Sequence, residues 1–265
     1  MKYKLIAIDL DGTVINQEGN IIPSARKAIQ RVIDRGIKVT LATGRMYKPS
    51  DYFAQELGIS APLICYQGAL IREPGNGNIL WHKPLPVSIA KRVIEAIRQM
   101  GIHKYVFVDD EMYVEEVTEK DNWYAERNGV RLNRVDDLVK FLKKQPTEIA
   151  ARDESAKLDR MIVHLNNGFG SSLNVTKVHS SFCEIGHADS GKGNALQYLA
   201  KLLGIEQSQT VAIGDGPNDI SMLKWAGLGI VVGTAPEEVT AAADWVIDTK
   251  SEDGFAQAME RLLNI

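Results

Sequence analysis

The sequence predicts an α/β fold in which a doubly wound, mostly parallel sheet of the Rossmann type is interrupted by an inserted α+β domain. Short apolar runs alternate with amphipathic helical segments near both ends of the chain, and the short joints between them are typical of parallel strands with crossover helices. In the middle of the chain, strand-like pairs joined by tight turns replace this rhythm. We therefore expect a core of residues 1–83 and 187–265 and an inserted domain of residues 84–186.

The core is predicted in two halves, each an alternation of buried apolar runs with helical patterns that commonly stop at a glycine. The expected elements of the first half are strand Leu5–Ile8, helix Ser24–Arg35, strand Ile37–Ala42, helix Pro49–Leu57 and strand Leu63–Tyr66. Those of the second half are helix Lys192–Leu203, strand Thr210–Ile213, helix Ile220–Trp225, strand Leu228–Val232, helix Pro236–Ala242, strand Trp245–Ile247 and helix Gly254–Leu263.

The inserted domain follows the stiff connector Lys83-Pro84-Leu85-Pro86. Its strand pairs surround tight turns, which is typical of an antiparallel α+β module. Its expected elements are helix Ser88–Met100, strands Tyr105–Val108 and Met112–Val114, helices Thr118–Arg127 and Asp136–Lys144, and strands Glu148–Ala151, Met161–Leu165 and Phe182–Ile185.

Composition restricts the possible partners. The 265 residues include 31 Lys and Arg against 34 Asp and Glu, a formal net charge of −3, which gives no bulk attraction to nucleic acid or to an anionic membrane. The two cysteines cannot form a disulfide framework, and the apolar runs are too short for a signal peptide or a membrane span. We expect a cytoplasmic monomer or homodimer that binds a small molecule and has no nucleic acid or membrane partner.

Four strand ends in the core carry groups suited to chemistry. Open α/β sheets place their active sites at the carboxyl ends of the strands, so segments far apart in the chain can meet there. The four segments are Asp9-Leu10-Asp11-Gly12-Thr13, Thr43-Gly44-Arg45, Gln67-Gly68-Ala69 and Gly214-Asp215-Gly216-Pro217-Asn218-Asp219.

The first of these segments has two carboxylates two residues apart, where a strand ends in a glycine turn. One of them, Asp9 or Asp11, can act as a nucleophile while the other moves a proton. A calcium-binding EF-hand loop is excluded, because its sixth and twelfth positions would hold Val14 and Asn20 instead of Gly and Glu. The alternative is that these acidic residues merely cap the strand and turn.

The other segments offer ligands for a cation and for a phosphate group. Asp215 and Asp219 supply the hard oxygen atoms that suit Mg²⁺, although Gly, Pro, Asn and Asp together also form simple turns. Thr43-Gly44 can hold phosphate oxygens with a hydroxyl and a backbone N–H group. Lys192, at the start of a helix, can add a positive charge. Taken alone, an ordinary helix cap and a solvated lysine are the alternatives at these positions.

In four motifs the chain resembles the haloacid dehalogenase superfamily of phosphohydrolases, specifically its Cof-type branch with a large α/β cap of type IIB. The motifs follow one another along the chain as Asp9-Leu10-Asp11-Gly12-Thr13, Thr43-Gly44-Arg45, Lys192-Gly193-Asn194-Ala195 and Gly214-Asp215-Gly216-Pro217-Asn218-Asp219. The resemblance implies a catalytic core and a cap that selects the substrate. It also implies an Mg²⁺-dependent phosphomonoesterase that acts on small phosphorylated metabolites, most commonly sugar phosphates.

The resemblance further implies a role for each matched residue. Asp9 would attack phosphorus and form an aspartyl-phosphate, Asp11 would protonate the leaving group and then activate water, and Lys192 would neutralise the nucleophile and the phosphate, with Arg45 in a supporting role. The phosphate-binding residues would be Leu10, Thr43, Gly44, Lys192 and Asn218. The metal ligands would be Asp9, Asp11 through its backbone carbonyl, Asp215 and Asp219.

Two positions depart from the family pattern. Gln67 stands where many relatives have Asn, and Asp189-Ser190-Gly191 precedes Lys192 where Gly-Val-Ser is common.

Phosphorylated cofactors such as flavin mononucleotide or pyridoxal phosphate are alternative substrates, and a phosphomutase or phosphotransferase would use the same aspartyl-phosphate. A non-catalytic sensor is disfavoured because Asp9 and Asp11 are both present. A signalling receiver domain would be about half this size.

Overall fold

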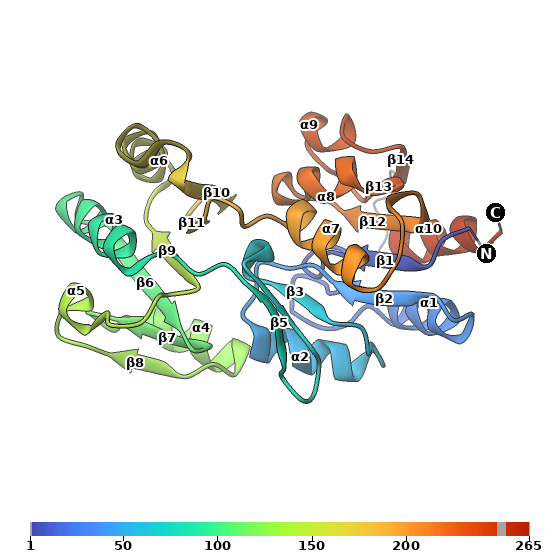
Figure 1. The fold of residues 1–265 in the computed structure, drawn as a ribbon, viewed down its shortest axis with the longest axis horizontal. Helices are drawn as coiled ribbons and strands as arrows, with labels where there is room; N and C mark the ends of the chain where they lie inside the picture. The colour runs from blue at the N-terminus through green and yellow to red at the C-terminus, as the bar shows by residue number, and fades with distance from the viewer. Residues whose placement is uncertain (1, 248–252, 265) are drawn as a thin grey trace. The chain divides into compact units, whose positions relative to one another are not determined.

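Five of the six strands predicted for the core form one sheet in the order β14-β13-β12-β1-β2, in which every neighbouring pair is parallel. A computed structural model describes residues 2–247 and 253–264 (Figure 1). Four of the strands are mostly apolar and, apart from the exposed Lys38, buried, because both faces of the sheet are covered by helices. The strands are β1 (Leu5–Ile8), β2 (Lys38–Leu41), β12 (Thr210–Gly214), β13 (Leu228–Val232) and β14 (Trp245–Ile247).

Helices cover the two faces of this sheet in separate groups. Helices α1 and α10 pack against each other, and α7 packs against α8. In α1, Pro23 starts the first turn, and Ala25, Ile29 and Val32 form the buried stripe. The helices of this part of the chain are α1 (Pro23–Asp34), α2 (Tyr47–Glu56), α7 (Lys192–Leu202), α8 (Ile220–Trp225), α9 (Glu237–Thr240) and α10 (Gly254–Leu263).

A small sheet of three strands extends the parallel sheet. Its first strand, β3 (Leu63–Cys65), lies beside the end of β2 through a parallel bridge between Ala42 and Ile64. The chain then makes a tight 3-10 turn, η1 (Tyr66–Gly68), and returns as β4 (Leu70–Arg72) and β5 (Ile79–His82). Similar short 3-10 turns are η3 (Gln207–Gln209) and η4 (Pro217–Asp219).

The chain divides into two compact units, which we call the core unit and the inserted unit. The core unit runs to Trp81 and resumes at Gly191, and the inserted unit is His82–Ser190. The inserted unit has a six-stranded sheet in the order β10-β11-β9-β6-β7-β8. Its strands are β6 (His103–Val108), β7 (Glu111–Val114), β8 (Leu132–Arg134), β9 (Glu148–Arg152), β10 (Leu173–His179) and β11 (Phe182–His187), and its helices are α3 (Val87–Gln99), α4 (Glu119–Asn128), α5 (Leu138–Phe141) and α6 (Ser155–Phe169), with a 3-10 turn η2 (Gly170–Ser172).

Alternate residues of this second sheet point to different surroundings. Val106, Ile149 and Cys183 pack with α3 and α6 in one apolar cluster. Their neighbours along the strands, such as Tyr105 and Phe182, therefore point to the opposite face.

No helix in residues 2–247 and 253–264 is long and apolar enough to cross a membrane.

One predicted strand of the inserted unit is wrong. Residues 161–165 lie inside helix α6 and not in a strand. Leu158, Met161 and Leu165 are the buried residues of that helix, and their spacing of three and four is the period of a helix. The short apolar window was misread because a strand and one and a half turns of buried helix have similar compositions.

Candidate functional site

The site lies at the place in the parallel sheet where the connections from neighbouring strands run to opposite sides of strand β1. From β1 the chain passes to β2 on one side, and after the inserted unit it returns to β12 on the other side. Asp9 follows β1 directly and its N–H donates to the carbonyl of Ile213, 2.8 Å away. Asp215 follows β12. Such a switch point leaves a crevice between strand ends, which is where α/β sheets bind ligands.

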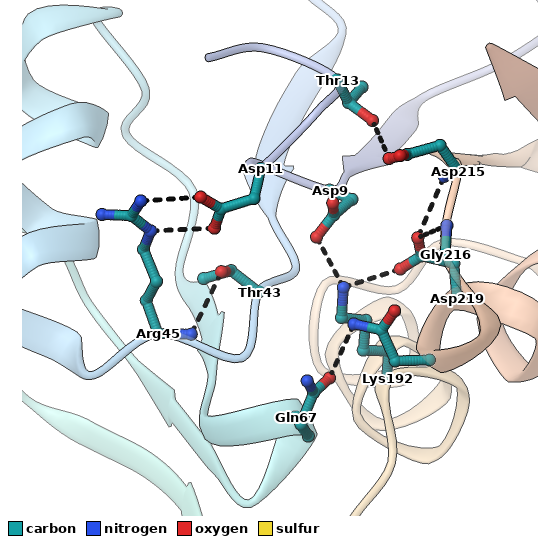
Figure 2. Close-up of polar contacts among 11 residues, drawn as sticks. Asp9, Asp11, Thr13, Thr43, Arg45, Gln67, Lys192, Asp215, Gly216 and Asp219 are labelled. Atoms are coloured by element: carbon teal, nitrogen blue, oxygen red, sulfur yellow. Dashed lines mark hydrogen bonds and ion pairs between the residues drawn. The ribbon is translucent and has the colours of Figure 1, made fainter. Parts of the chain in front are cut away.

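Lys192 is the central cation of this site (Figure 2). It is the first residue of α7, and its side chain is fully buried. Its Nζ lies 2.6 Å from Oδ1 of Asp9 and 2.6 Å from Oδ1 of Asp219. Burial disfavours the charged ammonium, but the two carboxylates outweigh burial and raise the pKa of Lys192. The lysine is therefore a permanent positive charge between two acidic segments that are 210 residues apart in sequence.

Three carboxylates gather around this single ammonium. Oxygen atoms of Asp9, Asp215 and Asp219 all lie within 4.8 Å of one another. Burial, followed by the Asp219 carboxylate, raises the pKa of Asp9 well above its ordinary value in spite of Lys192. The same two causes raise the pKa of Asp215 to about 6. Negative charge thus exceeds positive charge here, and the clustered hard oxygens fit a divalent cation such as Mg²⁺.

Two turns hold the acidic side chains in place. Oδ2 of Asp219 accepts hydrogen bonds from the N–H groups of Asp215, at 3.1 Å, and Gly216, at 3.0 Å. Oδ1 of Asp215 accepts one from the Thr13 hydroxyl at 3.0 Å. Gly12 has a φ of +81°, and a Cβ there would lie 2.7 Å from Oδ2 of Asp215. Glycine is required at this turn by its left-handed backbone and by the close approach.

Asp11 points away from the acidic cluster and toward Arg45, as Figure 2 shows. The two side chains form a bidentate ion pair, with Nε–Oδ2 at 2.8 Å and Nη2–Oδ1 at 2.6 Å. The Asp11 side chain is 55% exposed. The backbone N–H of Arg45 also donates to the Thr43 hydroxyl at 3.1 Å. This ion pair was not expected from the sequence, although Arg45 lies in one of the four motifs.

The turn η1, which follows β3, packs closely against the residue that precedes α7. Tyr66 and Gln67 have left-handed φ values of 50° and 51°, which is unusual for residues other than glycine. The Gln67 side-chain oxygen accepts a hydrogen bond from the Asn218 amide at 3.2 Å. A Cβ at Gly68 would lie 2.3 Å from the Gly191 carbonyl oxygen. Gln67 therefore positions Asn218, a contact that could not be foreseen at this departure from the family pattern.

The structure thus brings most of the sequence-predicted residues together at one sheet edge. The side chains of Asp9, Lys192, Asp215 and Asp219 are in direct contact or within 4.8 Å. Asp11 and Thr43 lie around Arg45. The side chain of Leu10 is fully buried, so a contact from this residue to a ligand would have to come from its backbone. The predicted roles of these residues in binding phosphate or metal remain predictions.

Comparison with known proteins identifies the family of the chain. A family model described as haloacid dehalogenase-like hydrolase matches residues 6–259. The chain belongs to this family. The superfamily resemblance and the α/β fold class predicted from the sequence are therefore confirmed, and the protein is an enzyme of this hydrolase family.

Several proteins align over almost the whole chain. A pyridoxal phosphate phosphatase of Escherichia coli, YbhA, is 29% identical, and the alignment covers 97% of each chain. A 5-amino-6-(5-phospho-D-ribitylamino)uracil phosphatase of Bacillus subtilis, YitU, is 25% identical over 100% of this chain and 99% of its own. The crystal structure of a haloacid dehalogenase-like hydrolase from Bacteroides thetaiotaomicron has a TM-score of 0.88 at 28% identity and covers 98% of this chain and 100% of its own.

Proposed function

We propose that the protein is an Mg²⁺-dependent phosphomonoesterase that acts on small phosphorylated metabolites through an aspartyl-phosphate. The observation that carries this proposal is the buried contact of Lys192 with Asp9 and Asp219, beside Asp215, at the switch point of the sheet. Hydrolysis of a phosphate monoester depends mainly on positioning and on neutralising charge. A fixed ammonium and a cluster of carboxylates able to hold a cation supply both. The phosphatase activity of relatives adds support.

In the proposed reaction, an oxygen of Asp9 forms a bond to phosphorus while the bond from phosphorus to the leaving oxygen breaks. Asp11 gives its proton to that leaving oxygen, then takes a proton from the water that hydrolyses the aspartyl-phosphate. Asp11 is paired with Arg45 in the structure, so its proton transfer requires this ion pair to open. Lys192 keeps Asp9 oriented and offsets the charge of the phosphoryl group.

The remaining site residues would bind phosphate and metal. The metal ligands would be Asp9, Asp215, Asp219 and the backbone carbonyl of Asp11. Bound Mg²⁺ would neutralise charge on the nucleophile and the transferring phosphoryl group. The phosphate-binding residues would be Leu10, Thr43, Gly44, Lys192 and Asn218, and Gln67 would orient Asn218 through its amide oxygen.

We propose a substrate class that is narrower than phosphate esters in general. Sugar phosphates are one candidate class. Pyridoxal phosphate and a phosphorylated ribitylaminouracil, on which two relatives act by name, are phosphate esters that carry a heterocyclic ring. We propose that residues of the inserted domain predicted at 84–186 select among these metabolites, as a cap. The candidate catalytic residues Asp9, Asp11 and Lys192 all lie in the core unit, as does the candidate metal ligand Asp215.

A screen of the purified protein against several dozen phosphorylated metabolites tests this function. Released phosphate is measured with Mg²⁺ and with excess EDTA, and Asp9→Asn is the inactive control. We expect Mg²⁺-dependent release that Asp9→Asn abolishes while the far-ultraviolet circular dichroism spectrum stays unchanged. Full activity in EDTA, or retained activity in Asp9→Asn, would contradict the mechanism. Adding an acceptor sugar and analysing the products distinguishes a phosphatase from a phosphomutase or phosphotransferase.

A further inference from the structure

The inserted unit contains a hollow of about 380 Å³ on the face of its sheet that α3 and α6 leave uncovered. Helix α4 supplies one side of the hollow, and strands β6, β9 and β11 supply the other. Strand register places Arg152 opposite Phe182, and Ala150 opposite Tyr105, so these side chains share one face. The lining residues are Tyr105, Lys120, Trp123, Tyr124, Arg152 and Phe182.

Most of this lining is aromatic. The rings of Tyr105 and Phe182 lie 5.9 Å apart. Trp123 is 59% exposed, and the guanidinium of Arg127 lies 5.1 Å from the centre of its ring. Aromatic side chains that gather around an apolar hollow at the surface are typical of binding sites. Aromatic walls of this kind are suited to stacking against a planar ring.

Two cations border the same hollow. Lys120 is exposed and forms no ion pair with the part of the chain that the structure describes. Arg152 has a side chain that is only 19% exposed, and its guanidinium lies 5.6 Å from the centre of the Tyr105 ring. An arginine has five N–H donors, and the bonds to Asp121 and Thr118 engage two of them. The ammonium of Lys120 and the remaining N–H donors of Arg152 therefore lie at the edge of an aromatic pocket.

Asp121 fixes two of these lining residues in advance. Its side chain is fully buried, and its Oδ1 accepts a hydrogen bond from the Tyr105 hydroxyl at 2.7 Å and lies 3.0 Å from Nη1 of Arg152. Its Oδ2 accepts a hydrogen bond from the backbone N–H of Thr118 at 2.8 Å, and this bond is part of the cap at the start of α4. One carboxylate therefore holds the helix, a ring and a cation together. Because these side chains are already ordered, less of their conformational entropy is lost when a ligand binds.

We propose that this hollow binds a planar aromatic ring that carries an anionic or carbonyl oxygen, with the ring against Trp123 and the oxygen at Lys120 and Arg152. The volume lies within the usual range for small-molecule sites, roughly 300–1,000 Å³. Two sources share this chemistry: the ring of a phosphorylated substrate, or a separate effector molecule. The inference goes beyond the proposed function, and only the part that assigns the ring to a substrate rests on that function.

Fluorine NMR of protein labelled with 5-fluorotryptophan tests binding directly. The chain has four tryptophans, and Trp123→Phe identifies the resonance of Trp123. We expect benzoate to shift that resonance saturably while the other three stay in place. Cyclohexanecarboxylate, which has the charge without the planar ring, should bind about two- to tenfold more weakly because it cannot stack.

Variants of the exposed lysines test the role of charge in the same assay. Lys120→Ala should weaken benzoate about two- to fivefold, the range of an exposed ion pair, and leave uncharged benzyl alcohol unaffected. Lys143→Ala, at another exposed lysine of the inserted unit, is the matched control and should change nothing. The proposal is overturned if no resonance moves, if all four move together, or if cyclohexanecarboxylate binds as tightly as benzoate.

Kinetics with two phosphate esters distinguish the source of the ring. If the ring belongs to the substrate, Trp123→Ala should raise KM for 4-carboxyphenyl phosphate about two- to tenfold but leave KM for acetyl phosphate unchanged, and benzoate should compete with the aryl ester. If the ring belongs to an effector, benzoate still shifts the Trp123 resonance but does not compete. If the protein hydrolyses no ester, the proposed function fails, and the NMR result decides the binding proposal alone.

Discussion

Replacing Lys192 by methionine should destabilise the protein and nearly abolish its activity. Methionine has a similar length and no charge, so it fills the space under the site but leaves Asp9 and Asp219 without their ammonium. The lysine side chain is fully buried, with its Nζ 2.6 Å from each carboxylate. Water therefore cannot replace the lost interaction, and three carboxylates within 4.8 Å of one another would remain.

The size of the effect follows from this geometry. Removing one partner of a buried ion pair costs about 3–5 kcal/mol, because it leaves an uncompensated buried charge. Each kcal/mol lowers Tm by about 2–4 °C in chains of 150–250 residues, so a decrease of roughly 10 °C is expected. Removing a pre-organised donor to developing charge lowers kcat about 10²- to 10³-fold.

Thermal unfolding in EDTA and in excess Mg²⁺, followed by circular dichroism, measures the loss of stability. We expect the Tm of Lys192→Met to rise more on adding Mg²⁺ than that of the unmodified protein, because the ion replaces part of the missing positive charge. Lys201→Met is the matched control, since Lys201 is an exposed residue of the same helix, α7. A decrease of less than about 2 °C in EDTA, or one equal to that of Lys201→Met, would refute the role of Lys192 in holding the carboxylates together.

Further substitutions test three other parts of the structure. Gly12→Ala should raise the Mg²⁺ concentration needed for half-maximal activity, because its Cβ would displace Asp215; an unchanged metal dependence would contradict this. Arg45→Ala should keep phosphate release within about tenfold of normal, whereas Asp11→Asn should lose about 10²- to 10⁴-fold; equal losses would show that Arg45 itself is needed for the chemistry. In the inserted unit, burial raises the pKa of Asp121, but hydrogen bonds from Tyr105 and Thr118 outweigh it and hold the pKa below 3.8, so its stabilisation is present above about pH 4 and is lost in stronger acid. Asp121→Asn should therefore lower Tm clearly at pH 7 and progressively less as the pH falls below about 4, and a decrease that does not change with pH would argue against the charge.

The fold was predictable where a buried element leaves a simple pattern. Parallel strands such as Leu5–Ile8 are apolar on both faces, and Leu228–Val232 was predicted with the bounds that the structure shows. Patterns failed where an element is short or only half-buried. Strand Leu132–Arg134 has no buried residue and was not predicted. Its place in the sheet depends on pairing with β7, which a local window of sequence does not contain.

The candidate site was predictable as a set of backbone positions, but its side-chain partners were not. Strand ends and glycine turns determine where Asp9 and Asp11 leave the sheet, yet the two residues have opposite surroundings. Asp9 is buried and pairs with Lys192, whereas Asp11 is exposed and pairs with Arg45. A buried carboxylate needs a charged partner far more than an exposed one does, so the buried ammonium of Lys192 pairs with Asp9. The choice depends on burial in the folded chain. It leaves Asp11 in an ion pair at the surface, where solvent makes the pair weak enough to open, as the proton transfers proposed for Asp11 would require.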